Sequence, residues 1–274
     1  MIATPIGIFD SGYGGLTVFK EIAARLPQYD YIYLGDNARA PYGTRSFETV
    51  YQYTWQCVQW FFTQGCPLVI LACNTASAKA LRTIQQIDLP KINDPTKRVL
   101  GVIRPTAEII GQYTHTKKVG ILATSGTVQS DSYPIEIAKF YPELEVYQQA
   151  CPMWVPLIEN NEHNSSGAKY FIEKNIEQLM AQSANTDTVL LACTHYPLLK
   201  NIIATLLPAS TVLLSQGEIV ANSLVDYLDR HAEIKTRLSK NGLMKFYTTD
   251  DPNDFDNHAP NFFGQKIKSE QLDL

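Results

Sequence analysis

Two seven-residue segments of the same design constrain the fold of this chain more than any other feature. They are VILACNT at residues 69–75 and VLLACTH at residues 189–195. Each is an apolar run that ends in Ala-Cys and continues into polar residues able to begin a helix. The pattern predicts the same strand-to-helix corner twice, as in an α/β protein with parallel sheets. Ligands bind beyond the carboxyl ends of such strands, so we expect Cys73 and Cys193 at the mouth of a site.

A second pair of similar segments indicates two related halves. Residues 119–130 (VGILATSGTVQS) resemble residues 6–18 (IGIFDSGYGGLTV), at nearly the same offset that separates the two thiol segments. An internal duplication, with two halves facing each other across a cleft, explains both pairs. Residues 87–98 are dense in Pro, Asp and Lys, which is typical of a connection between domains, so we place the first domain boundary there.

Charge and hydropathy exclude several classes of protein. The chain has 23 Lys and Arg against 27 Asp and Glu, a net charge of -4, and its longest basic tract is Lys117-Lys118. Nucleic-acid binding needs a basic face, so we expect no nucleic-acid partner. The longest apolar run, at residues 67–73, is too short for a membrane span, and the N-terminus does not read as a secretory signal. We therefore expect a cytoplasmic protein without a membrane partner.

Five cysteines without a CxxC pair are expected to be free thiols in a reducing compartment. A zinc site is not expected, because only His195 lies near a cysteine in the sequence. Cys57 and Cys66 are interpreted as small buried hydrophobic residues, and Cys151 as structural. The aromatic helix predicted at residues 47–63 is typical of a core or a subunit interface, and the acidic segment at residues 248–257 is expected to be a loop.

A matched pair of thiols is compatible with several chemistries. A nucleophilic cysteine works with one histidine base, and a second matched cysteine would be superfluous. A redox pair needs its sulfurs within disulfide reach, which thiols on two domain walls would meet only if the cleft closed. Removal of a proton from one face of a carbon and return from the other face needs two weak acids of similar pKa on opposite sides. Two cysteines meet that need.

The polar residues near these corners are candidate partners of the thiols and of a substrate. Asp10, His195 and Glu159 are candidates to orient the thiols or to shift their pKa values. Other side chains, and the backbone at Tyr42-Gly43, could bind carboxylates without an arginine. These side chains belong to Ser11, Asn74, Thr75 and Thr194.

Five segments in this order resemble the glutamate racemase family: IGIFDSGYGGLTV, GDNARAPYG, ACNTASA, CPMWVPLIE and ACTHYPLL. The resemblance extends from residue 6 to about residue 250. It implies that Cys73 and Cys193 are two acid/base thiols, that Asp10 is paired with Cys73, and that His195 and Glu159 are paired with Cys193. It also implies a set of substrate contacts: Asp10, Ser11, Pro41, Tyr42, Gly43, Asn74, Thr75, Thr194 and His195.

The resemblance further implies a fold and an activity. The expected fold has two three-layer α/β/α domains with mostly parallel sheets, related by a pseudo-two-fold axis, with the site in the cleft. One domain would comprise residues 1–97 and 212–274, and residues 98–211 would be inserted into it. The expected enzyme is a cytoplasmic homodimer that interconverts L- and D-glutamate for peptidoglycan synthesis, without cofactor or metal. Aspartate racemisation, or a non-catalytic protein that binds dicarboxylates or senses thiol oxidation, stays open as an alternative.

Two positions depart from the family pattern. Thr106 stands where the resemblance predicts Gly, and Ser215-Gln216 where it predicts Asp-Ser. Both lie outside the five shared segments, so we expect them to affect domain packing or the oligomer rather than the chemistry. The first strand is expected near residue 5 without a preceding extension, so regulation by a cell-wall precursor is not expected.

Overall fold

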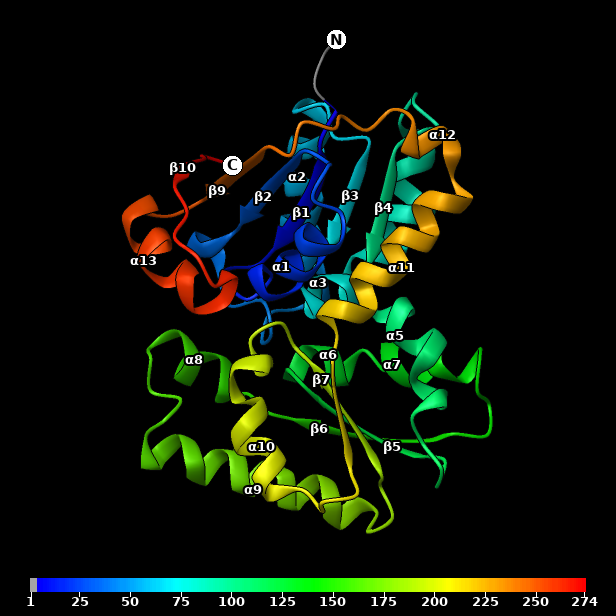
Figure 1. Cartoon of the computed structure of the whole chain (residues 1–274), viewed down its shortest axis with the longest axis vertical. Coiled ribbons are helices and arrows are strands. Elements are labelled where there is room, and N and C mark those ends of the chain that lie inside the picture. The colour runs from blue at the N-terminus through cyan, green and yellow to red at the C-terminus, as the bar shows by residue number, and fades with distance from the viewer. Residues whose placement is uncertain (1–3) are drawn as a thin grey trace.

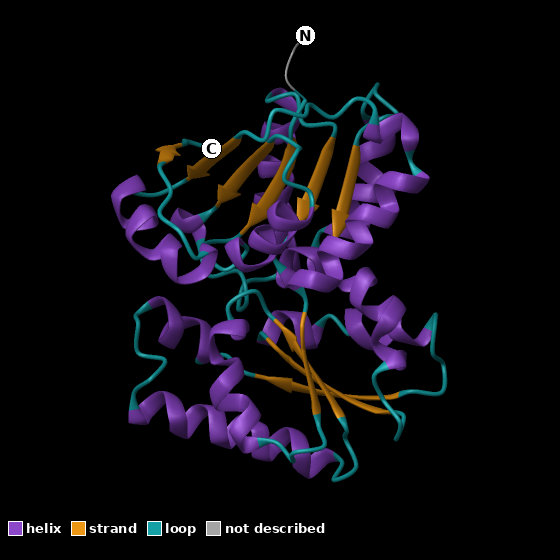
Figure 2. Cartoon of the chain, in the orientation of Figure 1, coloured by secondary structure: helices purple, strands orange, loops and turns teal. Residues whose placement is uncertain are grey.

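The computed structural model describes residues 4–274 and contains two parallel β-sheets, one in each of two α/β domains (Figures 1 and 2). The larger sheet has the strand order β10-β9-β2-β1-β3-β4 and the smaller one β6-β5-β7-β8. The orders β2-β1-β3-β4 and β6-β5-β7-β8 repeat the same arrangement, as the duplicated segments predict. The strands of the larger sheet are β1 Ile6–Asp10, β2 Tyr31–Gly35, β3 Leu68–Leu71, β4 Arg98–Gly101, β9 Met244–Thr248 and β10 Ser269–Gln271. Those of the smaller sheet are β5 Lys118–Ala123, β6 Glu145–Ala150, β7 Thr188–Ala192 and β8 Val212–Ser215.

Helices cover both faces of each sheet, because the central strands are apolar on both sides. In β1, Ile6 and Ile8 belong to one buried cluster and Phe9 to the cluster on the opposite face. The helices around the larger sheet are α1 Leu16–Arg25, α2 Phe47–Thr63, α3 Asn74–Lys79, α4 Leu81–Thr83, α11 Gly217–Arg230, α12 Ala232–Lys235 and α13 Pro252–Phe263. Those around the smaller sheet are α5 Ile103–Ile109, α6 Ser125–Gln129, α7 Ser132–Ala138, α8 Trp154–Glu159, α9 Ser166–Gln182 and α10 Lys200–Leu206. Within residues 4–274, no helix has the length and hydropathy to span a membrane.

The chain crosses between the two sheets after Gly101 and again after Ser215. β4 pairs with β3 in the larger sheet, and β8 pairs with β7 in the smaller one. The boundaries expected after residues 97 and 211 therefore fall four residues early in each case. The reason is that β4 and β8 are edge strands, each preceded by a connection with exposed residues, at 93 and 95 and at 208–210. Such a connection resembles a domain linker in composition, although the strand that follows it still belongs to the sheet of the preceding domain.

The expectation of an acidic loop at residues 248–257 is wrong, because this segment contains the start of α13. The Asp251 side chain accepts a hydrogen bond from the backbone N–H of Asn253, and Pro252 occupies the first turn, where its missing N–H costs nothing. Buried Phe255, Ala259, Phe262 and Phe263 form one face of the helix. The acidic residues that suggested a loop are favourable near a helix N-terminus.

Candidate active site

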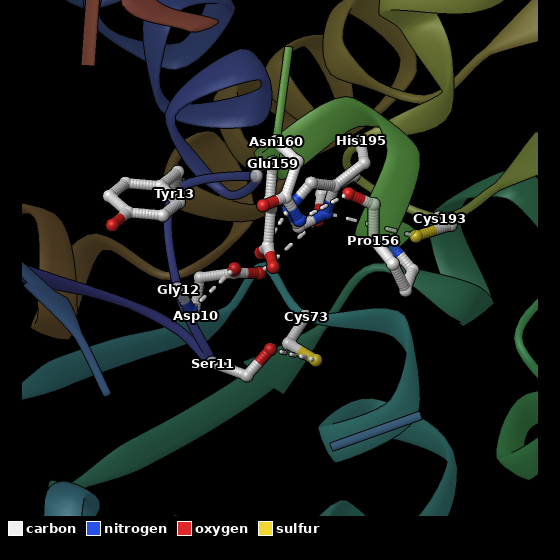
Figure 3. Close-up of polar contacts among 12 residues, drawn as sticks. Asp10, Ser11, Gly12, Tyr13, Cys73, Pro156, Glu159, Asn160, Cys193 and His195 are labelled. Carbon is white, nitrogen blue, oxygen red and sulfur yellow. Dashed lines mark hydrogen bonds and ion pairs between the residues drawn. The ribbon is translucent and has the colours of Figure 1, made fainter. Parts of the chain in front are cut away.

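Both thiols line a single cavity of about 80 Å³ at the carboxyl ends of the two sheets. Figure 3 shows Cys73 and Ser11 on one side of this space and Cys193 and His195 on the other. Every residue predicted from the sequence lines this cavity except Asp10. Thr124, Ser125, Val155 and Pro156 also line it and were not predicted.

Cys73 lies where β3 turns into α3 and serves as the N-cap of that helix. Its sulfur accepts a hydrogen bond from the backbone N–H of Ala76 at 3.4 Å and donates one to Ser11 Oγ at 3.5 Å. Burial, reinforced by the nearby Asp10 carboxylate, raises the pKa of Cys73 to about 12, although the N–H of Ala76 and the Ser11 hydroxyl, which can turn to donate to a thiolate, act in the opposite direction. Cys73 is therefore a protonated thiol at neutral pH.

Cys193 follows β7 in the other domain, and its closest partner is a histidine. His195 Nδ1 lies 4.0 Å from the sulfur, and His195 Nε2 lies 2.9 Å from Glu159 Oε1. Burial by itself would lower the pKa of His195, but hydrogen bonds to Cys193 and Glu159, together with the charge of Glu159, raise it to about 10. His195 is thus an imidazolium at neutral pH, and it places a positive charge beside Cys193.

Asp10 ends β1 and is fully buried behind the wall of the cavity. Its Oδ2 accepts from the N–H of Gly12 at 3.0 Å, and its Oδ1 accepts from Thr194 Oγ1 at 3.4 Å, which connects the two domains. Burial raises the pKa of Asp10 to about 6, and the His195 imidazolium opposes that shift. The structure therefore places Asp10 beneath the site, beside both thiol corners, rather than on the cavity surface.

We expect Asp10→Asn to raise the free energy of unfolding at pH 8 by about 1–3 kcal/mol, because an ionised carboxylate in this buried position is unfavourable. The folded pKa of about 6 exceeds the ordinary value of 3.8. The stabilising contribution of the protonated acid is therefore complete below pH 3.8 and is lost as the pH rises through 6. The difference between variant and wild type should appear over that range. Urea unfolding of both proteins at pH 4 and at pH 8 measures this difference in the free energy of unfolding.

Asp30 provides a matched control with the opposite sign. It is buried before β2, where burial opposes ionisation, but hydrogen bonds from the backbone N–H groups of Asn241 and Leu243 and from Asn241 Nδ2 prevail and lower its pKa. Asp30→Asn should therefore destabilise the protein at pH 8. A variant at Asp10 that loses stability at pH 8 as the one at Asp30 does would contradict the interpretation of Asp10.

The loop with Pro41, Tyr42 and Gly43 is held by an acid that sequence reasoning missed. Asp36, one residue beyond β2, accepts hydrogen bonds from Arg39 Nε at 2.7 Å and from the hydroxyl of Tyr42. On the other side, the N–H of Gly126 donates to the carbonyl of Gly43 at 2.7 Å. The sequence signal that could have identified Asp36 is its position directly after a buried strand. Asp10 occupies a similar position at the end of β1.

Thr124 is a second residue that sequence reasoning missed. Its hydroxyl lies 2.9 Å from that of Thr75, and it caps α6 by accepting from the N–H of Thr127. The repeat could have predicted it, since aligning residues 119–130 with residues 6–18 places Thr124 opposite Ser11. Each half of the duplication thus contributes a hydroxyl to the cavity from the loop after its central strand.

The two unusual positions lie closer to the site than expected. Gln216 Nε2 donates to Thr106 Oγ1 at 3.1 Å, so the two departures contact each other at the crossing between domains. Gln216 Oε1 also accepts from Asn74 Nδ2 at 2.7 Å, and Asn74 lines the cavity. The expectation that these positions affect only packing or the oligomer therefore needs correction.

The remaining cysteines and possible metal ligands give no further candidate group. Cys151 is buried and lines the cavity, and its sulfur donates to the carbonyl of Gln149 at 3.6 Å. Cys57 and Cys66 are buried outside the cavity. In the part of the chain that the structure describes, no three His, Cys, Asp or Glu side chains are grouped so as to hold a metal ion.

Comparison with known proteins gives the same family in sequence and in structure. A family model described as Asp/Glu/Hydantoin racemase matches residues 12–222. The glutamate racemase of Streptococcus gordonii is 39% identical over 271 residues, which cover 98% of each chain. The glutamate racemase isoform RacE1 from Bacillus anthracis has a TM-score of 0.89 and 32% identity, over 100% of this chain and 99% of that one. The Francisella tularensis enzyme, solved in complex with D-glutamate, has a TM-score of 0.87 and 30% identity, over 100% and 98% of the two chains.

Proposed function

This chain belongs to the Asp/Glu/Hydantoin racemase family, and from that premise we propose that it interconverts L- and D-glutamate by proton transfer at the α-carbon. The observation that carries the proposal is the presence of two thiols, one from each domain, on the wall of one cavity. Glutamate is favoured over aspartate because relatives 38% to 39% identical over nearly the whole chain are glutamate racemases. The same full-length similarity disfavours a non-catalytic binding or redox protein.

The two thiols have different surroundings, and this difference supports different roles for them in the proposed reaction. Cys73 rests as a thiol, so it is the proton donor for the first turnover. Cys193, whose sulfur lies 4.0 Å from His195 Nδ1, is the base that removes the α-proton. After transfer Cys193 carries the proton and Cys73 is the thiolate, so the opposite enantiomer reacts in the reverse direction. Glu159 acts through His195 and is a positioning residue.

The substrate carboxylates would be bound by neutral donors. Among the described residues that line the cavity, His195 is the only one with a cationic side chain, and the hydroxyls of Ser11, Thr75 and Thr124 and the amide of Asn74 supply hydrogen bonds. Fixed donors of this kind also stabilise the negative charge that spreads from the α-carbon into the carboxylate as the proton leaves. The small cavity excludes water around the reacting carbon, which strengthens these interactions.

We also place the enzyme in the cytoplasm as a homodimer that supplies D-glutamate for peptidoglycan. The support is the membership of the family together with the composition of the chain. Light scattering after size-exclusion chromatography tests the dimer, and a mass of one chain, 30.7 kDa, would refute it.

Circular dichroism of L- and D-glutamate incubated with the protein in buffer treated with chelator tests the activity. We expect the signal of both enantiomers to decay to zero, since racemisation from either side reaches the same equimolar mixture. In D₂O the product enantiomer should carry deuterium at the α-carbon, because the proton that returns comes from a thiol exchanged with solvent. A stable signal from both enantiomers would refute the proposed function, and decay with aspartate alone would favour the aspartate alternative.

A further inference from the structure

Four buried side chains form a hydrogen-bonded network behind the cavity, where the two domains join. They are Asn74 at the start of α3, Thr106 in α5, Tyr133 in α7 and Gln216 at the start of α11. Each of them is at most 3% exposed. Figure 1 shows α5, α7 and the beginning of α11 close together beside the connection between the domains. Asn74 alone among the four also lines the cavity.

The orientation of Gln216 is fixed by groups that accept its hydrogen bonds. Its Nε2 lies 3.2 Å from the carbonyl of Val102, 3.1 Å from Thr106 Oγ1 and 2.7 Å from the hydroxyl of Tyr133. A backbone carbonyl can only accept, and Thr106 Oγ1 already donates its hydrogen to the same carbonyl at 3.2 Å. The nitrogen of Gln216 must therefore point toward this group, and its oxygen must point toward Asn74.

The orientation of Asn74 follows from that of Gln216. Gln216 Oε1 accepts from Asn74 Nδ2 at 2.7 Å, and the hydroxyl of Tyr133 donates to Asn74 Oδ1 at 2.6 Å. Both ends of the Asn74 carboxamide are thereby assigned by the network, which removes the usual ambiguity between amide oxygen and nitrogen. None of the described residues accepts the second hydrogen on Asn74 Nδ2.

We infer that Gln216, supported by Thr106 and Tyr133, is a positioning residue that fixes Asn74 as a hydrogen-bond donor to a substrate carboxylate. The inference rests on the proposed function and deepens it. A carboxylate only accepts hydrogen bonds, so a reversed Asn74 amide would turn an oxygen toward it and repel it. Since Val102 and Gln216 lie at the two crossings of the chain, the network also links this donor to the junction between the domains.

The variant Gln216→Met tests the inference, because it keeps the length of the side chain and removes its hydrogen bonds. We expect KM for glutamate to rise about tenfold while kcat changes little, because the same carboxylate contact is made before and during proton transfer. The pH profile should not move, since neither thiol corner changes. Thr106→Val should have a smaller effect, because Gln216 Nε2 has two hydrogens and keeps two other acceptors.

A double-mutant cycle with Asn74→Ala separates positioning from general packing. If Gln216 acts through Asn74, Gln216→Met will raise KM in the wild-type background and not in the Asn74→Ala background. An equal rise in both backgrounds, or an unchanged KM in Gln216→Met, would overturn the inference. Gln85→Met is a control for the loss of a hydrogen bond from glutamine to a backbone carbonyl, because the exposed Gln85 donates through Nε2 to the carbonyl of Val99 without contact to Asn74. It should leave KM unchanged.

Calorimetric titration of glutamate keeps the test independent of activity. Weaker glutamate binding by Gln216→Met than by wild type supports the inference even if the wild-type protein does not racemise glutamate, a result that would refute the proposed function alone. If Gln216→Met does not fold, Tyr133→Phe replaces it, since it removes only the hydroxyl that donates to Asn74 Oδ1. Unchanged glutamate binding by the folded variant would overturn the inference.

Discussion

Serine in place of either Cys73 or Cys193 is expected to lower kcat/KM for glutamate racemisation by about 10³-fold or more. A hydroxyl is a far weaker acid than a thiol, so it neither holds a negative charge nor releases a proton at neutral pH. Because each direction of the reaction uses one cysteine as base and the other as acid, both variants should fail with both enantiomers. Initial rates from L- and from D-glutamate, followed by circular dichroism, measure the loss.

Cys66→Ser is the matched control for these variants. Cys66 is 1% exposed, comparable with Cys73 at 5% and Cys193 at 6%, but it does not line the cavity. The same substitution there removes a buried thiol without touching the site, so most of the activity should remain. Full racemase activity in Cys73→Ser or in Cys193→Ser would refute the two-thiol mechanism.

The position of both thiols on one cavity could be predicted from the sequence because it depends on local patterns. An apolar run that ends in Ala-Cys predicts a buried parallel strand with its corner at the ligand-binding edge. The repeat of this pattern predicts two such edges facing each other. The same reasoning placed Ser11, Asn74 and Thr194 on the cavity.

Features that depend on tertiary contacts could not be predicted in this way. α13 was missed because its acidic start resembles a loop until the apolar face formed by Phe255 and Phe262 is seen against the core. Gln216 and Thr106 lie 110 residues apart, and nothing local in either segment indicates that they meet. The pKa of Asp10 is raised by its burial, and one of its hydrogen-bond donors, Thr194, lies 184 residues away in the other domain.

The protonation of His195 gives the second large expected effect, because Glu159, one of the two partners that raise its pKa, can be replaced by a neutral residue of the same shape. Glu159 Oε1 accepts from His195 Nε2, and its charge helps to raise the pKa of His195 to about 10, against the effect of burial. Glu159→Gln keeps the shape of the acceptor and removes the charge. The pKa of His195 should then fall below about 10, so that the imidazolium is lost at a lower pH than in the wild type.

We therefore expect Glu159→Gln to lower kcat/KM by about 100-fold at pH 9 and by much less at pH 6, where His195 can still be charged. In the wild type, the raised pKa of His195 means that its contribution to stability is complete below pH 6.5 and is lost as the pH rises through 10. Activity profiles from pH 6 to pH 9.5, with NMR titration of the His195 ring, measure both effects. Glu162→Gln changes an exposed neighbour and should reproduce the wild-type profile. Parallel profiles for Glu159→Gln and wild type would show that the imidazolium beside Cys193 does not depend on Glu159.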